Sequence, residues 1–413
     1  MSKYITFAIA AGLNRGTIFL LLPILGFLVA SSNLGKISIF IISSQILIPF
    51  LTFNISSLIS REIYEKYKTT VAFVSAANFS LTAILLISVL IFILTQEDSI
   101  LIVSLAAAEG MFLVNSTYIR FTKVPNAYLI CTLCKFVILF IALGFSSFVE
   151  AIDINNVHII IFCMIASNLC VATYSIRFSA VLKNRIFFVF KKYLLCNKPL
   201  IFFALALIPH ILAQLAASGV DRYIIRYYLN NEILGVYVFA YSLAALFMLV
   251  NSSLALGFSQ SCVKNFEAFT QKSFFLKFFF VVTFLWLGLV IFLHFIFPFE
   301  FTKYQKPEVL SNVRWVLLGL YNLSFYYYFS SVLFYTRDVK YLSIATILVA
   351  IMNVGLAALL VPYAGIIGAS IATFIAYSFY FILVAVRCQI HIRNYAIYPI
   401  GFSFAALGVI CLL

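Results

Sequence analysis

Long apolar stretches separated by short polar connections recur along almost the whole chain. Nearly all of them reach the roughly 20 residues that a helix needs to cross a bilayer. The pattern therefore predicts an all-α polytopic membrane protein with twelve core transmembrane helices, and a shorter stretch at 396–413 leaves a thirteenth helix open. The twelve stretches lie at 4–29, 36–60, 71–95, 99–120, 125–148, 157–180, 200–228, 233–260, 273–297, 312–336, 340–361 and 365–387.

The polar connections alternate in charge along the chain. Lysine and arginine gather in one set, so the positive-inside rule places this set and the N-terminus in the cytoplasm. The basic set holds Lys3, Arg61, Lys66, Lys68, Arg120, Lys123, Arg177, Lys183, Arg185, Lys191, Lys192, Lys198, Lys264, Lys272, Lys277, Arg337, Lys340, Arg387 and Arg393. The other set holds Glu97, Asp98, Glu150, Asp153, Glu232, Glu300, Lys303, Lys306 and Glu308.

The composition supports a membrane protein and excludes other classes. The chain is 64% hydrophobic and 10% charged, whereas soluble domains carry about 25% charged residues. Soluble, secreted and nucleic-acid-binding proteins are thereby excluded, and the net charge of +14 reflects the cytoplasmic connections. Cys131 and Cys134 form a C-x-x-C without a neighbouring His or second Cys pair, so we expect free thiols and no metal site.

The widest cytoplasmic connection, 181–199, divides the spans into two sets of six. We expect an amino-terminal lobe at 1–180 and a carboxy-terminal lobe at 200–390, and an extra membrane segment at 391–413 is left open. The connection is rich in Phe, Lys and Arg, which suits either a helix lying in the membrane interface or a plain loop.

The two lobes show a weak internal repeat. Leu34-Gly35 opens the second span and Leu234-Gly235 opens the eighth. Equivalent pieces lie an even number of spans apart, so the repeat is predicted to be parallel. The two lobes would then be related by a pseudo-two-fold axis along the membrane normal.

Three charged residues interrupt apolar spans at nearly the same depth. Arg15, Glu109 and Lys135 each lie about eleven residues, or roughly 16 Å, from the predicted cytoplasmic end of their span. A charge at mid-bilayer costs a few kcal/mol or more, so such residues normally face a bundle interior or a wet cavity. We therefore expect a charged central cavity.

The seventh span carries a polar stripe. Its members recur every four residues, and a helix drifts about 40° over each such step, so the stripe should wind around the helix. Pro209 is expected to kink this span near its cytoplasmic end. The stripe comprises His210, Gln214, Ser218, Arg222 and Arg226, with Asp221 beside it.

Two stretches resemble polysaccharide transporters of the MATE-like (MOP) flippase superfamily. Residues 218–246 are similar to the seventh-to-eighth helix signature, and residues 361–381 to a Pro-x-x-Gly-x-x-Gly-Ala turn that enters the twelfth helix. The matching positions are Asp221, Arg222, Gly235, Tyr237, Ala240, Tyr241, Pro362, Gly365, Gly368, Ala369 and Ala372.

This resemblance implies an O-antigen or capsule flippase (Wzx-type) and not an enzyme. Such a protein moves a polyprenyl-diphosphate-linked oligosaccharide outward across a bacterial inner membrane by alternating access. The resemblance implies membrane lipids and polysaccharide assembly proteins as partners, no nucleic acid and no cofactor. A coupling proton or sodium ion is left open.

A lipid-linked diphosphate needs cations in a shielded cavity, because desolvating its phosphates requires compensating charge. Arg15, flanked by Gly12 and Gly16, is a candidate phosphate ligand, although it could instead pair with Glu109 or a helix-end carbonyl. Glu109 and Lys135 suit a buried ion pair. Alternatively, Glu109 binds the coupling ion and Lys135 a phosphate.

The seventh span adds further substrate candidates. Arg222 and Arg226 could receive the diphosphate late in transport, although Arg226 could equally reach outer lipid headgroups. His210 and Gln214 could contact sugars, and a lone His is also a common hydrogen-bonded core residue. Asp221 is assigned, like Glu109, to a coupling or structural ion pair.

Tyrosines and asparagines interrupt several other spans. They suit sugar contacts, but ring packing and interhelical hydrogen bonds account for them as well. They are Tyr321, Tyr326, Tyr327, Tyr328, Asn54, Asn251, Asn322 and Asn353.

Two other functions fit a polytopic membrane protein. A cation-coupled drug or metabolite exporter of the same superfamily would favour acidic residues in the membrane, whereas the balance here is basic. A membrane polymerase or ligase would carry catalytic groups on large outer loops, and the longest predicted outer loop, near 298–311, is short.

Overall fold

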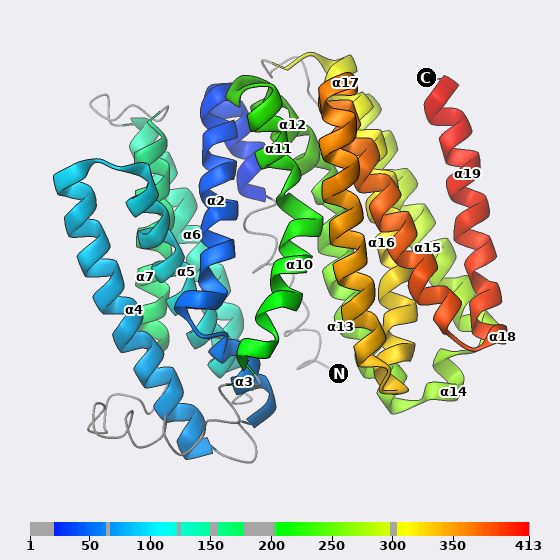
Figure 1. Cartoon of the computed structure of the whole chain (residues 1–413), viewed down its shortest axis with the longest axis horizontal. Helices are drawn as coiled ribbons and strands as arrows, with labels where there is room; N and C mark the ends of the chain where they lie inside the picture. Colours follow the sequence, from blue (N-terminus) through cyan, green and yellow to red (C-terminus); the bar gives the residue numbers. More distant parts are fainter. Residues whose placement is uncertain are drawn as a thin grey trace. The chain divides into compact units, whose positions relative to one another are not determined.

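The computed structural model describes residues 20–62, 67–121, 125–148, 156–176, 202, 204–297 and 304–412, and within these ranges every regular element is a helix (Figure 1). Two compact units account for them. The first comprises Lys36–Leu215, and the second comprises Ala216–Leu413 together with the segment that ends at Gly35. The connection 181–199 lies outside the described residues, so the predicted lobe boundaries stay a prediction.

The first unit packs around α5 (Asp98–Phe121), which contacts α3, α4, α6 and α7. Ala106, Ala107 and Ala108 are fully buried, and such small side chains let neighbouring helices approach closely in a membrane. The other elements are α2 (Ser31–Leu51, its first turn in the second unit), α3 (Ile55–Glu62), α4 (Tyr67–Thr95), α6 (Pro125–Phe148) and α7 (Val157–Ile176).

The second unit packs around α16 (Lys306–Tyr335), whose middle is buried on all sides. The elements around it are α10 (Ile208–Gly219, which begins in the first unit), α11 (Asp221–Tyr228), α12 (Asn231–Ala245), α13 (Phe247–Lys264), α14 (Phe266–Phe269), α15 (Lys272–Ile291), the π-helix η2 (Phe292–Ile296), α17 (Val339–Arg387), α18 (Ile390–Arg393), the 3-10 helix η4 (Asn394–Ala396) and α19 (Ile397–Leu412).

The long element α17 is a helical hairpin. Gly365 has φ 59°, a left-handed conformation that favours glycine, and it interrupts the helix three residues after Pro362. Tyr341 donates to the carbonyl of Leu383 at 3.0 Å, so the two arms run side by side in opposite directions (Figure 1). The predicted eleventh and twelfth spans are therefore the two arms of α17.

The seventh predicted span is broken. Helices α10 and α11 meet at Val220 with a bend of 50°. Near Pro209, where a kink is predicted, a turn at Leu207 precedes the first residue of α10. The bend separates Arg222 and Arg226 from the rest of the predicted stripe.

The two predicted repeat motifs meet within the second unit. A Cβ added to Gly35 would collide with the backbone oxygen of Asn231, and one added to Gly235 would collide with that of Ser31. The contact is reciprocal, as in a two-fold related interface, and only glycine allows the two helix starts to approach this closely.

The fold class is confirmed as an all-α polytopic membrane protein. Described helices coincide with eleven of the twelve predicted spans, and residues 20–28 continue the first one as a helix. The predicted segment at 396–413 is the helix α19.

Candidate functional site

The first unit buries a carboxylate in the middle of α5. Glu109 is only 7% exposed. The Ser44 hydroxyl on α2 donates to its Oε2 at 3.1 Å. A hydroxyl donor from a neighbouring helix compensates part of the cost of burying this group in an apolar surrounding.

The Lys135 ammonium lies near this carboxylate but contacts an aromatic ring. Its Nζ is 4.2 Å from the ring centroid of Phe112, one turn beyond Glu109 on α5, and the residue is 9% exposed. Glu109 and Lys135 interact electrostatically. Within the described residues, however, no nitrogen–oxygen pair of 4.0 Å or less joins them. Their functional pairing stays a prediction.

Two asparagines extend the polar interior of the first unit. Asn78 on α4 and Asn115 on α5 exchange hydrogen bonds in both directions, at 2.9 and 2.8 Å. Both side chains are buried. This pair joins two helices through satisfied amides and leaves the charged part of the interior to Glu109 and Lys135.

The second unit buries another carboxylate at the first turn of α11. Asp221 is 3% exposed, and its Oδ1 accepts the backbone N–H of Arg222 at 2.9 Å. Aspartate suits this position because the first backbone N–H groups of a helix have no intrahelical acceptors. The hydroxyl of Tyr237 on α12 donates to the other oxygen, Oδ2.

The Arg222 guanidinium accompanies this carboxylate. The residue is 8% exposed, and its Cζ lies 5.3 Å from the ring centroid of Tyr241. Its Nε is buried without a hydrogen-bond acceptor. Among the described residues, no carboxylate oxygen lies within 4.0 Å of its nitrogens. The guanidinium therefore retains donor capacity for an anion.

The remaining predicted site residues lie elsewhere. His210 and Gln214 share a hydrogen bond of 3.3 Å on α10, in the first unit. Arg226 is exposed on α11, and Arg15 lies outside the described residues. Among the predicted site residues, each unit thus buries one carboxylate and one cation, Glu109 with Lys135 and Asp221 with Arg222. The role of the predicted stripe stays a prediction.

The intramembrane asparagines bond to other helices or segments. Asn54 donates to the carbonyl of Ala204, Asn251 to that of Leu320 and Asn353 to that of Ala217, at 3.0, 3.0 and 2.8 Å. Asn322 donates to Ser378 at 2.8 Å. These contacts support interhelical bonding for all four.

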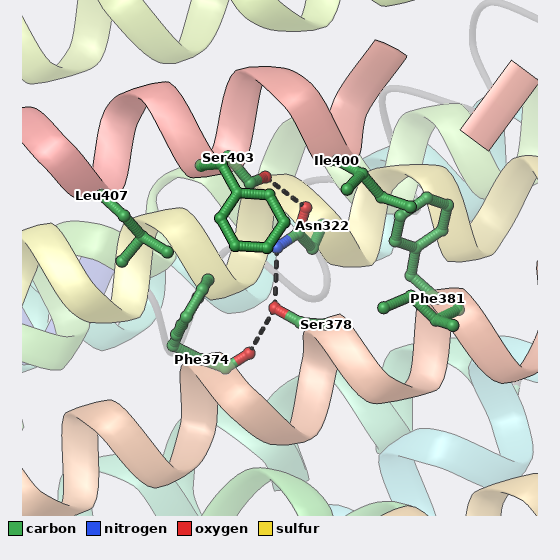
Figure 2. A pocket seen from close by; sticks show the side chains of 9 residues that line it. Asn322, Phe374, Ser378, Phe381, Ile400, Ser403 and Leu407 are labelled. Carbon is green, nitrogen blue, oxygen red and sulfur yellow. Dashed lines mark hydrogen bonds between the residues drawn. The ribbon is translucent and has the colours of Figure 1, made fainter. Parts of the chain in front are cut away.

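A cavity of about 170 Å³ lies between α16, α17 and α19, and no charged side chain lines it (Figure 2). Its polar side chains are hydrogen-bonded: Asn322 donates to Ser378, Ser403 donates to Asn322, and Ser378 donates to the carbonyl of Phe374. Phe374, Phe381 and other apolar side chains form the rest of the lining. The charged clusters, and not this cavity, carry the chemistry suited to an anion.

Comparisons with solved structures find similar folds at low sequence identity. No family model and no curated protein matches the sequence. The lipid II flippase MurJ, in an inward closed conformation, superimposes with a TM-score of 0.69 at 15% identity, covering 99% of this chain and 92% of MurJ. An inward-facing multidrug resistance MATE transporter of the MOP superfamily superimposes with a TM-score of 0.60 at 14% identity, and the match covers 98% of this chain and 96% of the transporter. An outward-facing multidrug resistance MATE transporter superimposes with a TM-score of 0.58 at 14% identity, and the match covers 93% of this chain and 95% of the transporter.

These similarities define the fold. The chain has the twelve-helix polytopic membrane fold that MATE transporters and MurJ share. At this level of identity, the likeness establishes the architecture and leaves the cargo open.

Proposed function

We propose that this protein is a flippase for a polyprenyl-diphosphate-linked oligosaccharide. It would move an O-antigen or capsule repeat unit from the cytoplasmic to the periplasmic face of a bacterial inner membrane. The N-terminus would lie in the cytoplasm. The flippase would act without enzymatic chemistry, with membrane lipids and polysaccharide assembly proteins as partners.

One observation carries this proposal: each unit buries a cation whose neighbouring carboxylate is already held by a hydroxyl group. Ser44 holds Glu109 beside Lys135, and Tyr237 holds Asp221 near Arg222. A buried cation without a close carboxylate is costly, and an anionic ligand would offset that cost.

The structural neighbours support the substrate class. MurJ, itself a lipid II flippase, gives a higher TM-score than the MATE transporters named above. The guanidinium of Arg222 matches phosphate, because its planar fork can donate two parallel hydrogen bonds to two oxygens.

A flipping experiment in proteoliposomes tests the proposal. A polyprenyl-diphosphate-linked oligosaccharide with a fluorescent sugar is placed in both leaflets, and a membrane-impermeant quencher then reports how much remains protected. We expect the wild-type protein to expose nearly all of the probe. Lys135→Gln and Arg222→Gln should leave about half protected, as in protein-free vesicles.

The MATE neighbours suggest the second function, export of a drug or metabolite by cation exchange. The same vesicles, loaded with a cationic dye, measure this activity. If the protein exported the dye and did not flip the probe, its function would be that of an exporter and not of a flippase. Unimpaired flipping by both Gln variants would remove the role of the buried cations.

A further inference from the structure

The cavity between three helices of the second unit suits an apolar ligand. It lies between α16, the second arm of α17 and α19, and its wall is almost entirely apolar (Figure 2). Its polar side chains, Asn322, Ser378 and Ser403, are already hydrogen-bonded. A polar ligand would have to compete with these bonds, whereas a hydrocarbon chain would leave them intact.

The cavity reaches the surface that the bilayer covers. Ile382 of α17 and Phe404 of α19 line it and are 40% and 70% exposed, whereas Phe381 lines it from the inside and is 1% exposed. Exposed apolar side chains on membrane-spanning helices face hydrocarbon. A ligand can therefore enter sideways from the bilayer, where the apolar molecules are lipid chains.

Helix α19 is fixed to its neighbours on the side away from α17. Ser403 donates to Asn322 of α16 at 2.9 Å, and the ring of Phe402 lies 5.0 Å from that of Tyr321 on α16 and 5.5 Å from that of Trp286 on α15. Among the described side chains, no hydrogen bond or aromatic ring contact joins α19 to α17. The cavity occupies this side, so a ligand that fills it would supply the missing packing contacts.

A basic connection joins the two helices that border the cavity (Figure 1). The second arm of α17 ends at Arg387, and α19 begins at Ile397. Asp338 holds Arg387 at 2.6 Å, whereas the exposed Arg393 has no carboxylate oxygen within 4.0 Å among the described residues. The predicted topology places Arg393 at the cytoplasmic surface, where basic residues attract anionic lipid headgroups.

The depth of the cavity matches a lipid chain that starts at this connection. Ile400 and Leu407, which line the cavity, lie seven and fourteen residues after Arg393, or roughly 10 and 20 Å along the helix. The hydrocarbon core of a bilayer is about 30 Å thick, and each leaflet contributes half of it. The cavity therefore begins within the cytoplasmic leaflet and extends to about the bilayer centre.

We propose that this cavity binds one acyl chain of an anionic phospholipid from the cytoplasmic leaflet, with the lipid phosphate at Arg393. The chain fills the gap between α17 and α19 and holds α19 against the rest of the unit. The site shares no residue with the buried cations that are proposed to bind a transported diphosphate. Its occupant is therefore a component of the membrane and not the cargo.

Native mass spectrometry of the purified protein tests the site with phosphatidylglycerol as the probe. Ile400→Trp places a large ring in the cavity. Ile375→Trp is the matched control, because Ile375 of α17 is 37% exposed and does not line the cavity. We expect the wild-type protein and Ile375→Trp to retain one phosphatidylglycerol through detergent exchange, and Ile400→Trp to lose it. Equal retention by the two tryptophan variants would overturn the site.

Thermal unfolding separates a filled cavity from a damaged protein. Added phosphatidylglycerol should raise the melting temperature of the wild-type protein and of Ile375→Trp, because a ligand that binds the folded state stabilises it. The melting temperature of Ile400→Trp should not respond. Ile400→Ala widens the cavity and should keep the response. If Ile400→Trp does not fold, a folded Ile400→Ala without any response would overturn the proposal.

Other lipids test which chain and which headgroup the site takes. Arg393→Gln should weaken the binding of phosphatidylglycerol about tenfold and leave that of phosphatidylethanolamine unchanged. Equal binding of the two lipids, unaffected by Arg393→Gln, would overturn the assignment of the headgroup. If undecaprenyl phosphate displaced phosphatidylglycerol and was itself lost in Ile400→Trp, the cavity would hold an isoprenoid chain, and the phospholipid would be ruled out.

Discussion

Each unit buries a carboxylate that is hydrogen-bonded to a hydroxyl group and a cation that lies over an aromatic ring, but the residue types differ. In the first unit, a serine hydroxyl at 3.1 Å holds Glu109, and Lys135 lies 4.2 Å from the centre of a phenylalanine ring. In the second unit, Tyr237 holds Asp221, and Arg222 lies 5.3 Å from the centre of a tyrosine ring. Both arrangements satisfy the anion with a neutral donor and leave the cation over an aromatic face, where it gains up to about 2 kcal/mol when desolvated.

The difference between the units lies in how tightly the anion is held. Asp221 accepts a backbone N–H as well as the tyrosine hydroxyl, whereas the one side-chain donor described for Glu109 is Ser44. We therefore expect Asp221 of the second unit to stay in place when Arg222 binds an anionic ligand. In the first unit, Glu109 has more freedom to turn towards Lys135.

The largest expected effect is that of Tyr237→Phe. The variant removes a hydrogen-bond donor from a buried carboxylate. It should cost about 3 kcal/mol of stability, because hydrogen bonds to charged groups contribute more to stability than those between neutral groups. Thermal unfolding in detergent measures the loss. Tyr328→Phe, whose hydroxyl bonds to a neutral carbonyl, should cost about 1 kcal/mol. Equal losses in the two variants would contradict a special hold on Asp221.

The reciprocal glycine contact should give the next effect. Gly235→Ala places a methyl group against the backbone of Ser31 and should cost about 2 kcal/mol through overpacking. Gly35→Ala should behave alike, since the contact is symmetric. The control is Gly355→Ala on α17, where nothing lies within 4 Å and alanine should stabilise the helix by up to about 1 kcal/mol. A harmless Gly235→Ala would argue against close contact of the two helix starts.

Ser44→Ala should have a smaller effect than Tyr237→Phe. The loss of one hydroxyl donor at 3.1 Å should cost about 1.5 kcal/mol of stability, and Glu109→Gln in the same chain should recover part of it. The same unfolding assay applies. If Ser44→Ala were less stable than Tyr237→Phe, the first unit and not the second would hold its carboxylate more tightly.

The direct interaction between Glu109 and Lys135 should have the smallest of these effects on stability. Their charged atoms are more than 4.0 Å apart, so a double-mutant cycle of Glu109→Gln and Lys135→Met should give an interaction free energy of about 1 kcal/mol. Strictly additive losses would show that the two charges act independently. A value of several kcal/mol would establish the close ion pair expected from their equal depth.

The sequence predicted the membrane helices well because apolar length is a local property. The hairpin of α17 was also readable, since Pro362 and Gly365 mark its turn. The bend at Val220 was missed, although Gly219 followed by Asp221 is a usable signal for one helix ending and another beginning. The hydroxyl groups that hold the two carboxylates could not be predicted, because Ser44 and Tyr237 come from other helices and only packing brings them there.

Binding of a polyprenyl diphosphate tests the central claim most directly, since the buried cations are held to be available for a phosphate. The affinity of purified protein for undecaprenyl diphosphate is measured by titration, with undecaprenyl alcohol as the uncharged control. We expect Lys135→Met and Arg222→Met each to weaken diphosphate binding about tenfold, or about 1.4 kcal/mol. Affinity for the alcohol should be unchanged in both. Wild-type affinity for the diphosphate in both variants would contradict the account.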